Sequence, residues 1–162
     1  MTIKEVIDGI DWDDEYFVFD IADRIAERIV IDDTPESVDR LGRLPAGLRY
    51  IEPLIYYSNQ VDNGGHHQYF WNSQGVYREL VKDGLVYYGV QPYTEIFQEA
   101  LKSYRPGDYQ CEEGGTWEGF TEAYSEKRFD SIDDRFFAAD PDLADLIGVK
   151  VFNELYKNMQ VE

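Results

Sequence analysis

Two adjacent histidines, His66 and His67, are the side chains best suited to chemistry in this sequence. Imidazole binds zinc and acts as a general base, so the possible sites are a metal site and an acid–base pair of His67 with Glu52 or Asp62. Neighbouring side chains on a helix point about 100° apart, which keeps both rings from one ion. With no third histidine and no recognisable nucleophile, phosphate loop or triad, the sequence predicts no metal, no cofactor and no enzyme activity.

Two other residue patterns are equally weak evidence for a chemical site. The single cysteine, Cys111, cannot form an internal disulfide, and the two glutamates that follow it should raise the pKa of its thiol. The run that contains Asp130, Asp133 and Asp134 is similar to a calcium loop. It lacks the spacing, the central glycine and the terminal glutamate of an EF-hand.

The net charge of −18 narrows the choice of partners. Phosphates would be repelled, which argues against direct binding of nucleic acid or of anionic membranes. No apolar run reaches membrane-spanning length, and the first residues lack the apolar region of a signal peptide, so we expect a cytoplasmic protein. Basic protein surfaces and cations remain as partners, although acidity can also serve solubility alone.

The negative charge is concentrated in two segments. Residues 1–40 contain thirteen Asp and Glu against four Lys and Arg, and residues 108–145 contain twelve against three. Residues 41–107 and 146–162 are each balanced. Solubility does not require such segregation, so the two segments are candidates for a binding surface.

In both segments, helical patterns expose the carboxylates. Residues 12–30 predict a helix with Val18, Ile21, Ala22, Ile25 and Ile29 on its apolar face and an Asp20–Arg24 pair beside the acidic one. Thr116 can cap a second helix, in which glutamates recur at every fourth residue up to Glu126. The candidate partner-binding carboxylates are Asp13, Asp20, Asp23, Glu27, Asp32, Asp33, Glu118, Glu122, Glu126, Asp130, Asp133 and Asp134.

The amount of charge is compatible with imitation of DNA. Eighteen negative charges correspond to about 30 Å of duplex, at one charge per ~1.7 Å of axis. A compact domain of this length has a diameter of about 40 Å. Carboxylates one helical turn apart are separated by about 5–6 Å, close to the spacing of phosphates along a strand.

The remaining patterns predict an all-α protein, a compact single-domain multi-helix bundle over residues 1–162. Aromatic and β-branched runs at 16–19 and 85–88 leave strands as an alternative there. Thr34–Pro35 and Pro45 are predicted helix starts, and Pro53 should kink or restart the second of these helices. An apolar stripe over 75–88 predicts a helix that ends at Gly89. Another helix is predicted from Pro92 to Tyr104, and Asp140–Pro141 should start the last one.

The most unusual stretch is 62–75. Asn63, Gly64 and Gly65 form a turn that requires positive φ and closes one helix. A short helical turn follows over 68–71, and Asn72 or Ser73 can cap the next helix.

The stretch resembles the motif of a bacterial family with a helical domain of formerly unknown function, which includes a DNA-mimic protein. The matching residues are Asn63-Gly64-Gly65, Gln68-Tyr69-Phe70, Asn72-Ser73 and Gly75, and the resemblance extends over about 40–158, with the acidic helix 12–30 outside it. We interpret the motif as architectural because it carries no net charge.

The resemblance implies a protein-binding module whose carboxylates replace DNA phosphates on a basic transcriptional regulator or nucleoid protein, and it allows a homodimer. Two alternatives remain. The chain could be an immunity or antitoxin-type inhibitor of a toxin, or it could be a helical scaffold domain without mimicry.

Overall fold

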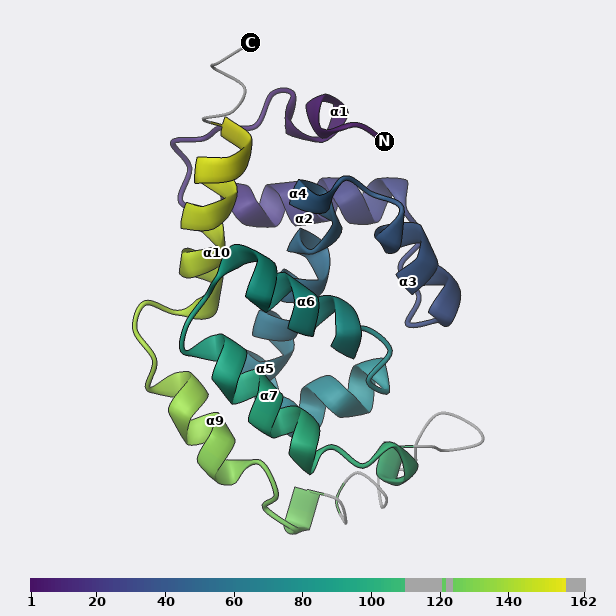
Figure 1. Ribbon diagram of the computed structural model, residues 1–162, viewed down its shortest axis with the longest axis vertical. Coiled ribbons are helices and arrows are strands. Elements are labelled where there is room, and N and C mark those ends of the chain that lie inside the picture. Colours follow the sequence, from purple (N-terminus) through teal and green to yellow (C-terminus); the bar gives the residue numbers. More distant parts are fainter. Residues whose placement is uncertain (110–120, 122–123, 157–162) are drawn as a thin grey trace.

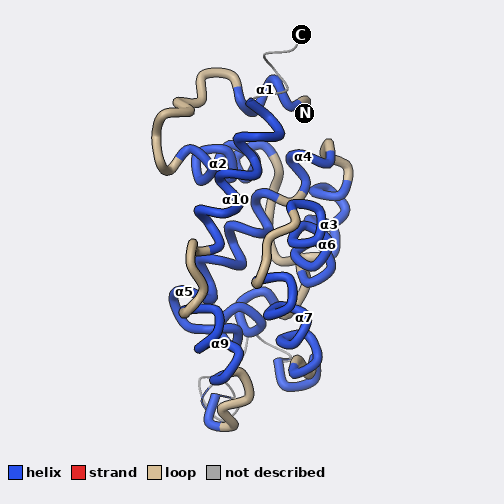
Figure 2. Tube along the Cα trace, turned by 60° about the vertical axis from the view of Figure 1, so that its left-hand side comes forward, coloured by secondary structure: helices blue, strands red, loops and turns tan. Residues whose placement is uncertain are grey.

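Helices form all of the regular secondary structure in residues 1–109, 121 and 124–156, the part of the chain that the computed structural model describes (Figures 1 and 2). The all-α prediction is confirmed: of the two strand alternatives, residues 17–19 and 85–88 lie in helices. In chain order the elements are α1 (Ile3–Ile7), α2 (Phe17–Arg28), α3 (Pro35–Gly42), α4 (Ala46–Arg49), α5 (Ile51–Ser73), α6 (Arg78–Tyr88), α7 (Tyr93–Ser103), η1 (Pro106–Tyr109), α9 (Asp130–Phe137), α10 (Leu143–Val151) and η2 (Phe152–Tyr156).

Helix α2 has the predicted amphipathic character, with Val18, Ile21 and Ile25 buried. It begins at Phe17, so Asp13 lies in the preceding turn rather than in the helix. The predicted pair of Arg24 with Asp20 is wrong. The Arg24 guanidinium instead donates to the carbonyl oxygens of Val6, Asp8 and Gly9, because the end of α1 presents free carbonyls beside it. Arg24 therefore holds α1 against α2.

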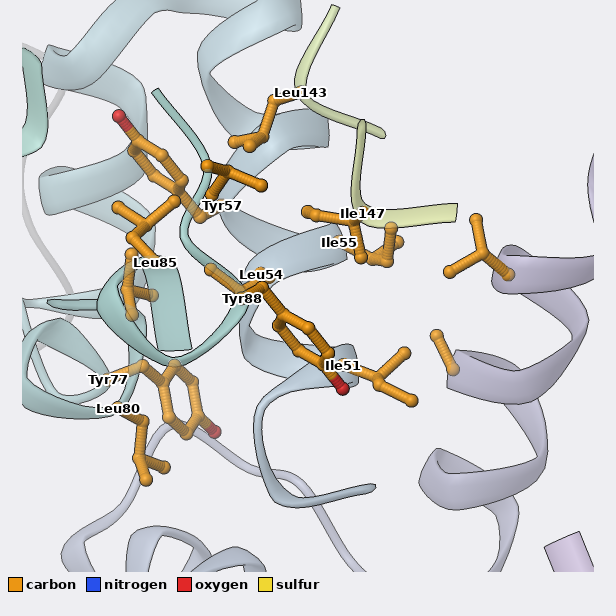
Figure 3. Packing of buried hydrophobic residues seen from close by; sticks show 14 of the residues in the cluster. Ile51, Leu54, Ile55, Tyr57, Tyr77, Leu80, Leu85, Tyr88, Leu143 and Ile147 are labelled. Carbon is orange, nitrogen blue, oxygen red and sulfur yellow. The ribbon is translucent and has the colours of Figure 1, made fainter. Parts of the chain in front are cut away.

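The core is built around α5. Ile51, Leu54 and Tyr57 on this helix are fully buried, and Figure 3 shows them in one cluster with side chains of α6 and α10, both of which pack against α5. Pro53 stands in the first turn of α5, directly after α4 ends, which agrees with the predicted restart.

Two helix caps differ from the prediction. Asn72 and Ser73 end α5 instead of capping α6, which begins at Arg78 without a side-chain cap. The cap of α10 is Asp142, whose Oδ1 accepts from the backbone N–H of Asp145 at 2.8 Å, and Asp140 lies before it. In each case several residues can serve as a cap, and tertiary packing decides which one does.

Helix α9 was not predicted, because its eight residues include four charged side chains and only a short apolar stripe. It packs against α5 and α7 through buried Ile132 and Phe136. From α9 the chain passes through 138–142 into α10, which lies against the start of α2, and these parts follow one another along the left-hand side of Figure 1.

Candidate partner-binding surface

The carboxylates of α2 are presented to solvent. Asp20, Asp23 and Glu27 are exposed on the side of the helix opposite to its buried residues. Asp13 is also exposed, and its backbone N–H donates to Oδ1 of Asp11 at 3.1 Å. All four carboxylates can contact a partner in the arrangement that the structure shows.

The next two candidates are engaged within the fold. Asp32 forms an ion pair with Arg40 at 3.0 Å and accepts from the Thr34 hydroxyl at 2.6 Å. Asp33 has a positive φ of 54°, and its backbone N–H donates to the Tyr77 hydroxyl at 3.0 Å. Burial of the Asp33 carboxyl raises its pKa. Both residues are exposed, but Arg40 compensates the charge of Asp32, and the backbone of Asp33 is bonded to Tyr77 just before α3 begins.

The second acidic segment divides in the same way. Asp130 and Asp134 are exposed on α9, whereas Glu126 is paired with Arg128 at 2.5 Å and lies 3.9 Å from Arg105. Asp133, between the two exposed aspartates, points into the protein. Glu118 and Glu122 lie outside the described residues.

Asp133 binds the motif segment. Its Oδ1 accepts from the backbone N–H of His66 at 3.0 Å and lies 2.5 Å from His66 Nδ1. The other ring nitrogen of His66 lies 2.7 Å from the Tyr57 hydroxyl. The histidine is fully buried, and both of its ring nitrogens are engaged in this chain of hydrogen bonds.

The glycines of the motif make this contact possible. Gly64 and Gly65 interrupt the helical conformation inside α5, and Gly65 has φ 74° and ψ 179°, a conformation that essentially only glycine adopts. A Cβ on Gly65 would overlap the Asp133 carboxylate. The break in α5 thus lets Asp133 reach the backbone of the motif and fixes the orientation of α9.

The polar residues of the motif act locally. The side-chain amides of Gln68 and Asn72 both donate to Oε1 of Gln60, at 3.1 and 2.6 Å, and so join the two halves of α5. Asn63 is exposed, directly before the break at Gly64. These contacts agree with our architectural interpretation of the motif.

A group of carboxylates that the sequence did not single out lies where the two acidic segments meet. Burial raises the pKa of Asp145, and the charges of Asp142, Glu15 and Asp140 raise it further. Glu15 belongs to residues 1–40, and the other three belong to residues 108–145. Counting charges along the sequence shows that both segments are acidic. Only the packing of α10 against the start of α2 brings these particular carboxylates together.

Within the described residues, no three His, Cys, Asp or Glu side chains are grouped so that they could hold a metal ion. Over the same ranges, none of the helices combines the length and the apolar character needed to cross a bilayer. His67 is buried and packs edge-to-face against the Tyr124 ring at 5.4 Å.

Comparison with known proteins gives one result. The family model described as DMP19-like protein matches residues 42–152. Neither the search of curated proteins nor the search of solved structures gives a match. The matched region includes the glycine break, the His66–Asp133 contact, α9 and α10, and it covers more than half of the sequence. This chain therefore belongs to the DMP19-like protein family.

Proposed function

We propose that this protein is an acidic protein-binding module that acts as a DNA mimic and occupies the DNA-binding surface of a basic transcriptional regulator or nucleoid protein. The observation that carries the proposal is the meeting of the two acidic segments beside α10, where Glu15, Asp142 and Asp145 line the same groove. Membership in a family of DNA-mimic proteins supports it.

The electrostatic argument concerns charge that the fold leaves uncompensated. Arg40, Arg128 and His66 each bind one carboxylate. Other carboxylates stay exposed and form no ion pair within the described part of the chain: Asp20, Asp23, Glu27, Asp130 and Asp134. A DNA-binding face gains affinity by neutralising a series of phosphates and releasing counterions. A surface with several uncompensated carboxylates offers the same face an equivalent gain.

The proposed role is binding and not catalysis. The burial of His66, with both of its ring nitrogens hydrogen-bonded, supports this because a general acid or base must reach a substrate. His67 is likewise buried.

Capture and competition together test the proposal. The immobilised protein is exposed to lysate at about 50 mM salt, and bound proteins are identified and then challenged with a DNA duplex. We expect basic DNA-binding proteins that the duplex displaces. Light scattering of the purified complex gives its stoichiometry and tests the homodimer.

Charge variants make the test specific. Asp130→Asn with Asp134→Asn, or Asp20→Asn with Asp23→Asn, should weaken the captured complex by about fivefold, from two contacts of a few tenths to one kcal/mol each. The matched control is Asp83→Asn with Glu95→Gln, two exposed carboxylates from the balanced segment. A complex that is indifferent to DNA, or equally weakened by the control, contradicts the mimic. A captured toxin that DNA does not displace would favour the immunity-type alternative.

A further inference from the structure

A groove of about 820 Å³ lies between the start of α2 and one face of α10. Asp145, Val149 and Phe152 line it from the α10 side, and Glu15, Tyr16 and Phe19 line it from the α2 side. Tyr16 is 61% exposed and Val149 is 58% exposed, so large apolar side chains are left uncovered. The α2 part of the groove lies outside the region that matches the family.

The floor of the groove is firmly packed. Phe17 contacts the rings of Trp12 and Phe152, at centroid distances of 5.3 and 6.3 Å. Gly148 lies beside this floor, and a Cβ there would stand at ordinary contact distance from Val18 and Phe17, 3.8 and 3.9 Å away. The fold therefore does not require glycine at this position for space.

The edge of the groove is acidic. Glu15, Asp142 and Asp145 belong to its lining, and no Lys or Arg is among the residues that line it. These three carboxylates line the same groove and so lie near enough to repel one another. In agreement, the charges of Asp142 and Glu15 raise the pKa of Asp145, after the larger effect of burial. A cationic ligand would relieve this repulsion, and an apolar group would cover Tyr16 and Val149.

We propose that this groove is the docking site for a basic amphipathic segment of a protein partner. Apolar side chains of the segment contact Tyr16, Phe19 and Val149, and its Lys or Arg side chains pair with Glu15, Asp142 and Asp145. The proposal deepens the proposed function, from which it takes only the basic character of the partner.

A second copy of this chain fits the groove less well. Each copy carries a net charge of −18, and a shared interface at the groove would bring its carboxylates towards those of the other copy. Like charges brought together across an interface oppose association. The acidic edge thus selects a basic occupant over a homodimer.

Fluorescence anisotropy with a defined probe tests the docking site. The probe is a labelled helical peptide with Leu at i, i+3, i+4 and i+7 and Lys at the other positions, and its partner peptide has Ser in place of every Leu. Val149→Arg introduces bulk and a positive charge that repels the lysines of the probe, so it should weaken binding of the Leu peptide by about tenfold or more. Val86→Arg is the matched control, since Val86 is 60% exposed on α6.

A charge variant and a map complete the experiment. Asp145→Asn should lower the affinity for the Leu peptide by about threefold, whereas Asp83→Asn on α6 should leave that affinity unchanged. Amide NMR shifts caused by the peptide should centre on Tyr16, Val149 and Asn153. Circular dichroism confirms that each variant remains folded.

The outcomes distinguish a failure of the docking-site proposal from a failure of the DNA-mimic proposal. Equal affinity for the Ser peptide, shifts elsewhere, or equal effects of Val149→Arg and Val86→Arg overturn the docking site. If the peptide binds in the groove but DNA displaces nothing captured from lysate, the mimic fails and the docking site stands. If DNA displaces the captured proteins and the groove variants have no effect on the peptide, the reverse holds.

Discussion

At the scale of single residues, neighbours in the sequence have opposite roles. Asp134 is exposed on α9, while Asp133 accepts hydrogen bonds from buried His66. The contacts of a charged side chain also differ from what its spacing suggests: Arg24 binds the backbone carbonyls of Val6, Asp8 and Gly9 rather than an acidic side chain. Formal charge therefore overstates the field that a partner meets, and each carboxylate has to be judged by its contacts.

Glu52 shows how burial alters a single carboxyl. Burial, and after it the charge of the neighbouring Asp33, raises the pKa of Glu52 to about 7. Its Oε2 is buried and has no hydrogen-bond partner among the described residues. The folded pKa lies above the value of 4.5 in the unfolded chain. The folded state is therefore destabilised as the pH rises from about 4.5 to about 7, over which the unfolded chain ionises first.

We expect Glu52→Gln to raise the free energy of unfolding at pH 8 by about 2–3 kcal/mol, because the amide removes the cost of ionising a buried group. At pH 5 the gain should be much smaller. Urea denaturation of both proteins at the two pH values measures it. The exposed Glu95→Gln serves as the control, and equal gains at both pH values would contradict the assignment.

At the scale of elements, the break within α5 connects the motif to α9. Gly65 supplies the special backbone conformation, and Asp133 of α9 fills the space that a side chain would need. Phe136 anchors the same helix between Tyr57 and Tyr93, at ring distances of 5.8 and 5.1 Å. The position of the exposed carboxylates on α9 therefore depends on a glycine far away in the sequence.

Substitution of the two glycines should have unequal effects. Gly65→Ala should lower the free energy of unfolding by about 1–3 kcal/mol, because alanine is strained at its φ of 74° and its methyl would overlap Asp133. Gly64→Ala should cost less, since its φ of −165° suits any residue and the atom in the way is the end of the flexible Gln68 side chain. Thermal and urea unfolding provide the comparison.

A double variant isolates the contact with α9. If the overlap with Asp133 contributes, Gly65→Ala combined with Asp133→Ala should be less destabilised than the sum of the single variants. The backbone strain at Gly65 would remain. Additive losses would mean that the contact has no part in the effect.

At the scale of the whole molecule, negative charge opposes compactness. A net charge of −18 repels itself more strongly in the folded state than in the expanded chain. We expect NaCl, from low concentration to about 0.15 M, to raise the melting temperature by about 2–4 °C through screening. Differential scanning calorimetry at fixed pH measures the shift.

The variant with Asp130→Asn and Asp134→Asn should respond less to salt than the wild type does. The double control Asp83→Asn with Glu95→Gln shows how far the position of the removed charges matters. A melting temperature that falls as salt is added would indicate that attractive ion pairs, such as Asp32–Arg40, dominate instead.

Features that depend on local periodicity and composition can be read from the chain alone. The apolar stripe of α2, the cap at Thr34, the end of α6 at Gly89 and the positive φ within the motif all follow from rules that act over a few residues. The segregation of charge was equally legible, because it needs only counting.

Tertiary structure alone decided which of these charges remain available. Asp133 is paired with a residue 67 positions away, and Glu15 meets Asp142 and Asp145 only because α10 packs against the start of α2. Hydrogen bonds and electrostatic repulsion act over a few ångströms in space, and periodicity along the chain contains no information about such contacts. For the same physical reason the groove beside α10 became visible only in the folded protein.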